Sequence, residues 1–153
     1  MRRSAHLDRH AVHPVLVVFP LGLFALSLAF DAVALMTDQG AFSSVATADI
    51  AGGVALGLIA AIFGVLDLRE LPQGSRAARI GLAHATMALT MLALFGASLA
   101  TRVASPSRLP SGLAVGLSLA GIACSAIVGA LGGALVDRVG VQRPYAAGVT
   151  GLE

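Results

Sequence analysis

Residues 14–30, with the sequence PVLVVFPLGLFALSLAF, contain no charged side chain and lie between His13 and Asp31. Eighteen residues of α-helix rise about 27 Å, which is close to the thickness of the hydrocarbon core of a bilayer. This stretch therefore predicts a membrane-spanning helix with an ionisable residue at each end.

The same spacing recurs twice along the chain. Asp49 and Asp67 enclose a second uncharged stretch, and His84 and Arg102 enclose a third. Eighteen helical residues at about 100° each complete five turns, so both members of a pair project from the same face of their helix. The pattern predicts several spans of one length, each with polar ends on a shared face.

The composition agrees with a membrane domain. Of 153 residues, 57% are hydrophobic and only 12% are charged, and the mean hydropathy is +0.88, which is too apolar for an ordinary soluble domain. Because this length leaves no room for a separate soluble catalytic domain, we lean toward a non-enzymatic protein. We expect one membrane domain over residues 1–153, with spans at about 14–36, 45–68, 80–101 and 113–136 and a tail at 137–153.

The connections and the basic residues predict the topology. Short links favour antiparallel neighbours, so we expect an all-α, up-down four-helix bundle. All ten basic residues are arginines, and only Arg102 and Arg108 lie on the side of the membrane opposite to the other eight. The excess of arginine predicts that both termini are cytoplasmic. No basic stripe with interleaved aromatic residues indicates nucleic-acid binding.

Three span ends meet at the cytoplasmic level of such a bundle: His13, Asp67 and His84. The two histidines suit the axial positions of a b-type haem, with Asp67 orienting a ring. The three residues also have the composition of a two-His, one-carboxylate metal site, but no local motif supports one. Alternatively, His13 caps the first span and His84 bonds to Asp67 at the headgroup boundary. The sequence leaves these interpretations open.

The outer level holds Asp31, Asp49 and Arg102. A carboxylate near the hydrocarbon is rare unless it is paired or functional, and Arg102 is the obvious partner. A structural ion pair is the simpler interpretation of this layer, and a proton or cation pathway is the alternative. Such a pathway needs polar steps through the middle of the bundle, where serines and threonines are few and scattered.

Small residues mark two helix faces. In lipid, such residues let helices approach closely, and packing rather than hydrophobicity drives their association. We therefore expect both faces to pack against other helices, the face of the fourth span either within the bundle or across a homodimer. The residues are Gly53, Gly57 and Gly64 in the second span and Gly121, Ser125, Gly129 and Gly133 in the fourth.

Five segments resemble one protein family: HPVLVVFPLGL (13–23), FD (30–31), GLIAAIFGVLD (57–67), RAARIGLAH (76–84) and GGALVDRVGV (132–141). Nearly the whole chain is similar to the four-span predicted membrane proteins catalogued as domain of unknown function 2231. The resemblance implies a four-helix domain of the bacterial inner membrane. It places His13, Pro14, Pro20, Asp31, Asp67 and His84 on the family's motif positions.

Two departures from the family pattern bear on a cofactor. Many members carry a second histidine where this chain has Val18. Glu, Tyr and His are frequent in the family where this chain has Ala134, Asp137 and Val139. These departures favour a structural role for the histidines, whereas relatives joined to redox domains favour haem.

We therefore expect a non-enzymatic subunit of a larger membrane assembly, in contact with lipid and with other membrane subunits or a second copy of itself. The abundance of small-residue faces motivates this hypothesis. The alternatives are an electron-transfer module that binds haem b through His13 and His84, and a protein that translocates protons or metal ions.

Overall fold

A computed structural model describes the backbone of residues 4–104 and 106–141 and the side chains of residues 15–104 and 106–136. The described residues form α-helices joined by short loops. Each helix covers one predicted span and extends beyond it. All four helices are long and apolar enough to cross a membrane. They are α1 (Ser4–Thr37), α2 (Gly40–Arg69), α3 (Arg76–Ala104) and α4 (Gly112–Val141).

The turn between α1 and α2 consists of Asp38 and Gln39. Asp38 has a φ of 55°, in the left-handed region that aspartate tolerates better than most residues. In the next loop, residues 70–75, Gly74 has a φ of 75° and takes the same role without steric cost. Both turns therefore reverse the chain within a few residues.

Serine caps the start of two helices. The Ser75 hydroxyl accepts a hydrogen bond from the backbone N–H of Ala78 at 3.0 Å, at the start of α3. The Ser111 hydroxyl accepts one from the N–H of Ala114 at 3.2 Å, at the start of α4. Each bond satisfies an N–H that has no partner within its own helix, which fixes where the helix begins.

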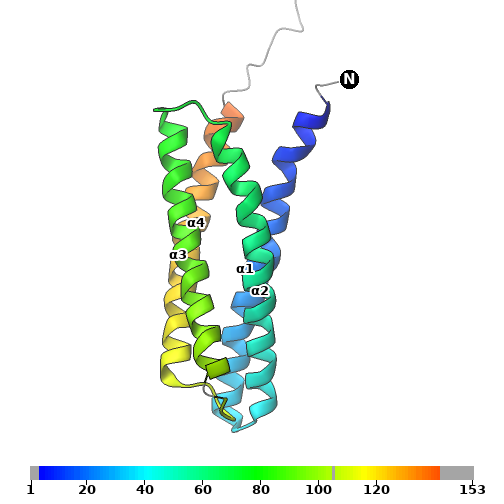
Figure 1. The fold of residues 1–153 in the computed structure, drawn as a ribbon, viewed down its shortest axis with the longest axis vertical. Coiled ribbons are helices and arrows are strands. Elements are labelled where there is room, and N and C mark those ends of the chain that lie inside the picture. The colour runs from blue at the N-terminus through cyan, green and yellow to red at the C-terminus, as the bar shows by residue number, and fades with distance from the viewer. Residues whose placement is uncertain (1–3, 105, 142–153) are drawn as a thin grey trace, which may run out of the picture.

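The helices pack as two hairpins, α1 on α2 and α3 on α4, which meet mainly along α2 and α3. Helices α1 and α4 meet over a shorter stretch, and α1 is diagonal to α3. The α1–α2 turn and the α3–α4 loop lie at one end of the bundle, here called the two-loop end, and the α2–α3 loop lies at the opposite, one-loop end (Figure 1).

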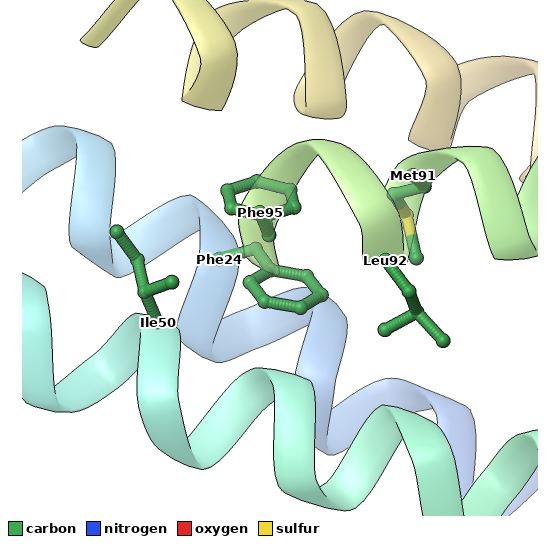
Figure 2. Close-up of a cluster of buried hydrophobic side chains, with 5 residues drawn as sticks. All are labelled: Phe24, Ile50, Met91, Leu92 and Phe95. Atoms are coloured by element: carbon green, nitrogen blue, oxygen red, sulfur yellow. The ribbon is translucent and has the colours of Figure 1, made fainter. Parts of the chain in front are cut away.

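The apolar core lies at mid-length and is formed by Phe24, Ile50, Met91, Leu92 and Phe95 (Figure 2). The rings of Phe24 and Phe95 stack with centroids 3.8 Å apart and planes 6° from parallel. Since these rings come from α1 and α3, the stack joins the two hairpins across the diagonal of the bundle.

Glycines on the other two helices make room for the rings. A Cβ on Gly53 of α2 would lie 2.5 Å from the ring of Phe24, and one on Gly121 of α4 would lie 2.6 Å from the ring of Phe95. Gly57 faces Leu92 in the same way, at 2.5 Å. The small residues at these three positions therefore set how closely α2 and α4 approach the core.

Candidate functional site

Arg102 of α3 and Asp31 of α1 form a buried ion pair near the two-loop end. Nη1 donates to Oδ1 at 2.9 Å and Nη2 donates to Oδ2 at 2.5 Å. The side chains are only 5% and 1% exposed. Both carboxylate oxygens are bonded to the guanidinium, the planar two-bond geometry in which arginine binds a carboxylate most strongly. The pair is a second diagonal contact between α1 and α3, about two helical turns from the aromatic stack toward the two-loop end.

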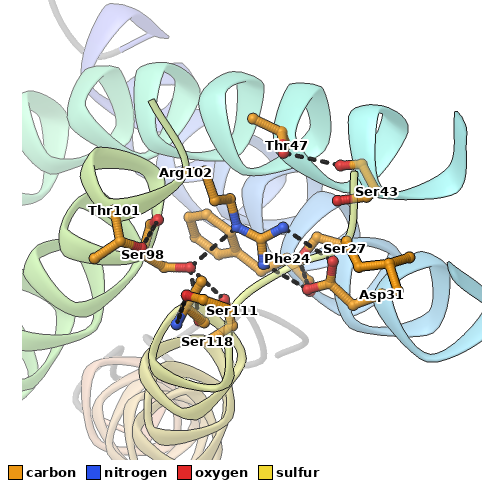
Figure 3. Close-up of polar contacts among 12 residues, drawn as sticks. Phe24, Ser27, Asp31, Ser43, Thr47, Ser98, Thr101, Arg102, Ser111 and Ser118 are labelled. Atoms are coloured by element: carbon orange, nitrogen blue, oxygen red, sulfur yellow. Dashed lines mark hydrogen bonds and ion pairs between the residues drawn. The ribbon is translucent and has the colours of Figure 1, made fainter. Parts of the chain in front are cut away.

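Two buried serines extend the pair to α4 (Figure 3). The Nε–H of Arg102 donates to the hydroxyl of Ser98 at 3.4 Å, and that hydroxyl donates to the carbonyl of Ala114 at 2.8 Å. The Ser98 proton is thus used, so Ser118, 2.9 Å away, must be the donor between the two hydroxyls. Helices α1, α3 and α4 consequently share one polar network, here called the Arg102 network.

Asp49 lies outside this network. It is half-buried on α2, and its Oδ2 is buried without a hydrogen-bond partner among the described residues. Of the two carboxylates that the sequence places at the outer level, Arg102 therefore binds Asp31 alone. An unpaired carboxyl inside a span is costly, which makes Asp49 an exception to the otherwise satisfied polar groups of this region.

A cavity of about 260 Å³ opens beside the Arg102 network at the two-loop end. It lies between the start of α2, the end of α3 and the α3–α4 loop, and we call it the vestibule. Arg102 is on its wall together with six hydroxyl side chains and the apolar Pro106, Leu109 and Pro110. The hydroxyls belong to Ser43, Ser44, Thr47, Thr101, Ser107 and Ser111.

His84 lies half-buried on α3, in the half of the helix toward the one-loop end. Its Nδ1 is 3.0 Å from the carbonyl oxygen of Val128 on α4. Since a carbonyl only accepts, this hydrogen bond requires a proton on Nδ1. Gly132 makes room for the imidazole, because a Cβ there would lie 3.3 Å from Cε1.

Asp67 and His13 are the other two residues of the predicted cytoplasmic level. Asp67 is half-buried near the end of α2. The backbone of His13 belongs to α1, but its side chain lies outside the described residues. Within the described part of the chain, no three histidine, cysteine or acidic side chains gather as a metal site would require. The pairing of His13 with His84 thus stays a prediction.

The small-residue strip of α4 divides into two parts. Gly121 packs on Phe95, whereas Gly129 and Gly133 are exposed, and no described atom lies within 4 Å of a Cβ built on either. Ser125, between them, is half-buried and donates to the carbonyl of Ile122 in its own helix at 2.7 Å. Gly64 of α2 is half-buried.

The middle of the bundle offers few polar groups for a pathway. Thr86 and Thr90 are exposed, and each donates to the carbonyl four residues earlier in α3. The interior at this depth is the apolar core, which includes the Phe24–Phe95 stack (Figure 2). Among the described residues, the fully buried polar side chains therefore stop at the stack.

The sequence pattern does not predict the partnership of Ser98 and Ser118. One signal was present, because Ser98 precedes Arg102 by four residues and so shares its helix face. Ser118 carries no comparable signal, since only the packing of α4 on α3 brings it to Ser98. The aromatic stack was missed for the same reason.

Comparison with known proteins agrees with the membrane architecture. A model of the family described as "Predicted membrane protein (DUF2231)" matches residues 9–144. This match confirms the resemblance found in the sequence. No curated protein and no solved structure matches the chain.

Proposed function

Because the chain belongs to the DUF2231 family of predicted membrane proteins, we propose that it is a non-enzymatic subunit that assembles, within the membrane, with another protein or a second copy of itself. The observation that carries this proposal is the exposed part of the α4 strip. Gly129 and Gly133 are four residues apart on one face, the spacing of the small-xxx-small motif by which helices associate in lipid.

An exposed glycine in a helix is unfavourable by itself. It costs about 1 kcal/mol relative to alanine in helix stability. Gly53, Gly57 and Gly121 offset that cost by admitting a side chain of a neighbouring helix. Gly129 and Gly133 have no such neighbour among the described residues, so a helix from outside the bundle accounts for them.

The topology in the bilayer belongs to the same proposal. We place the chain in the bacterial inner membrane as an antiparallel up-down bundle, with both termini cytoplasmic. The arginine distribution supports this orientation, since eight of the ten lie at the one-loop end or at the termini. The vestibule and the Arg102 network then face the outer side.

The assembly is tested by bulky substitutions on the exposed strip. Gly129→Leu combined with Gly133→Leu should reduce the oligomer mass, or the recovery of co-purifying membrane proteins, because the leucines hold a partner helix away. The measurements are light scattering after size exclusion in mild detergent and native pull-down. Gly22→Leu is the matched control, since Gly22 is also exposed and has no described atom within 4 Å of a Cβ. A wild-type protein that is monomeric and recovered alone contradicts the proposal.

The second candidate is a module that binds haem b, and the geometry of His84 supports it. A histidine that binds iron typically donates its other ring nitrogen to a carbonyl or carboxylate, which fixes the ring's orientation. The bond from Nδ1 of His84 to the carbonyl of Val128 has this form. His13 would be the second axial ligand, with Asp67 orienting a ring.

Absorption spectroscopy tests the haem candidate. Protein purified from haem-replete cells should show a Soret band that is lost in His84→Ala and in His13→Ala. Thr86→Val is the control, because this exposed residue lies two positions from His84 and bonds only within α3. A colourless wild-type protein rules out the candidate.

Proton or metal-ion translocation is the third candidate. The unpartnered oxygen of Asp49 favours it, since an unpaired carboxyl in a span commonly marks an ion path. The apolar middle of the bundle provides no continuation of such a path. Flux into liposomes that does not change in Asp31→Asn and Asp49→Asn would remove this candidate.

A further inference from the structure

The vestibule has the features of a binding site that is independent of the assembly proposed above. Among the described residues, Arg102 is the one charged residue on its wall, and Asp31, which binds the guanidinium, does not line it. The wall thus includes the arginine, and the carboxylate that compensates its charge is not part of the wall. A guanidinium has five N–H donors, and Asp31 and Ser98 take three of them. Asp31 and Ser98 therefore leave two N–H donors of the guanidinium unused.

Two helix N-termini add to the positive potential. Ser43 and Ser44 lie in the first two turns of α2, and Ser111 is the N-cap of α4. The amino ends of helices carry partial positive charge and unpaired N–H groups, which favour anions. Both helices begin at the vestibule, and their two amino ends outnumber the one carboxyl end on the wall, which is that of α3.

The hydroxyl groups on the wall differ in whether they already donate a hydrogen bond to the protein. Ser44, Thr47, Thr101 and Ser107 each donate to a backbone carbonyl, so they offer a ligand only lone pairs. The oxygen of Ser111 instead accepts the Ala114 N–H, which leaves its own proton for another acceptor. Together with Arg102, Ser111 therefore provides donors from two different elements.

We propose that the vestibule binds a phosphate group, carried either by a lipid headgroup or by a small soluble phosphate ester. Phosphate has several acceptor oxygens and suits donors that converge from different directions. The volume of about 260 Å³ holds more than the phosphate alone, and Pro106, Leu109 and Pro110 form an apolar wall for the rest of the molecule. The site lies beyond the apolar core, at the end of the spans, where headgroups reside.

The decisive variant is Ser111→Asp. Aspartate is as good an N-cap as serine, so α4 keeps its start, but its carboxylate brings a negative charge into the vestibule. The matched control is Ser75→Asp, which makes the same exchange at the N-cap of α3, at the one-loop end. A second variant, Ser43→Ala, removes a buried wall hydroxyl without adding charge.

Two probes distinguish the sources of the phosphate. Native mass spectrometry in a neutral detergent compares retention of phosphatidylglycerol with that of a diglucosyl diacylglycerol, which lacks phosphate. Calorimetry on delipidated protein measures binding of glycerol 3-phosphate. We expect Ser111→Asp to weaken phosphate binding at least about tenfold and Ser43→Ala roughly three- to tenfold. Ser75→Asp should bind as the wild type does.

Each outcome of these measurements either supports or overturns phosphate binding in the vestibule. Selective retention of phosphatidylglycerol, lost in Ser111→Asp, assigns the site to a headgroup, whereas binding of glycerol 3-phosphate with the same dependence assigns it to a soluble ester. Equal retention of the two lipids with no binding of the ester overturns the proposal, as does equal binding by Ser111→Asp and Ser75→Asp. If Ser111→Asp fails to fold, as judged by circular dichroism, Ser43→Ala decides, and an unchanged affinity in that variant contradicts the proposal.

Discussion

At the scale of single residues, Arg102 is the side chain on which the two-loop end depends. It binds both oxygens of Asp31 and the hydroxyl of Ser98, so it contacts groups of α1 and α3 and, through Ser98, reaches Ser118 of α4. Such a pair is costly to bury and is favourable only when its bonds are complete. Removing one partner is therefore worse than removing both.

We expect Arg102→Gln to lower the free energy of unfolding by about 3–5 kcal/mol, because Asp31 keeps a buried charge without compensation. The double variant Asp31→Asn, Arg102→Gln should lose much less, since both charges are gone. Circular dichroism during denaturation in detergent measures the effect. Arg108→Gln is the control, because the Arg108–Asp38 pair is 67% and 70% exposed and exposed pairs contribute at most about 1 kcal/mol. The expectation is contradicted if the double variant loses as much free energy of unfolding as Asp31→Asn and Arg102→Gln lose together when each is made alone.

At the scale of elements, the small residues of α2 and α4 serve two different surfaces. Gly53, Gly57 and Gly121 lie against side chains of the core, whereas Gly129 and Gly133 face outward. The strip of α4 advances by four residues, which turns it about 40° at each step, so Gly129 and Gly133 lie about 80° and 120° around the helix from Gly121. At the same level, Val128 and Gly132 keep α4 packed against His84 of α3. The same residue type is therefore constrained by internal packing at one end and, in the proposed assembly, by a partner helix at the other.

Substitution by alanine separates packed from open glycines. Gly121→Ala should destabilise the protein by about 1–3 kcal/mol, because its methyl group would lie 2.6 Å from a ring already held in a stack. Gly22→Ala should be neutral or stabilising by up to about 1 kcal/mol, since alanine is the better helix former and the site is open. Thermal unfolding in detergent compares them, and equal effects would show that Gly121 is not packed as described.

At the scale of the whole molecule, the contacts that join the two hairpins across the bundle lie in the half near the two-loop end. The stack of Phe24 on Phe95 and the pair of Arg102 with Asp31 both cross the diagonal there (Figures 2 and 3). Beyond Ala60, toward the one-loop end, α2 has no buried residue. The half that contains His84 and Asp67 is thus the looser half, where a cofactor or a partner helix would add most.

Cysteine labelling tests the proposed orientation of the whole molecule. In a Cys124→Ala background, Ser107→Cys should react with a membrane-impermeant maleimide added to intact spheroplasts, because the α3–α4 loop would face outward. Gln73→Cys should react only after the membrane is opened, since the α2–α3 loop would be cytoplasmic. Both positions are exposed. The reverse pattern of labelling would contradict the proposed topology.

Much of the architecture was predictable because lipid imposes a simple rule. A span needs about twenty apolar residues, so the three uncharged stretches that follow His13, Asp49 and His84 predicted three helices at nearly the observed positions. The apolar run at residues 113–136 predicted the fourth. Helical periodicity likewise placed Gly53 and Gly57 on one face of α2. These features depend on distances along one helix, which the sequence specifies directly.

The partners of the polar residues were decided only by the tertiary structure. Asp31 and Asp49 look equivalent in the sequence as candidates for Arg102, yet the diagonal approach of α1 and α3 pairs Arg102 with Asp31, and Asp49 has an oxygen without a partner among the described residues. Similarly, the rotation of α4 places Gly121 inward and Gly129 outward. Such choices depend on how helices rotate and tilt against each other, and that is set by side-chain packing across chain segments far apart in the sequence.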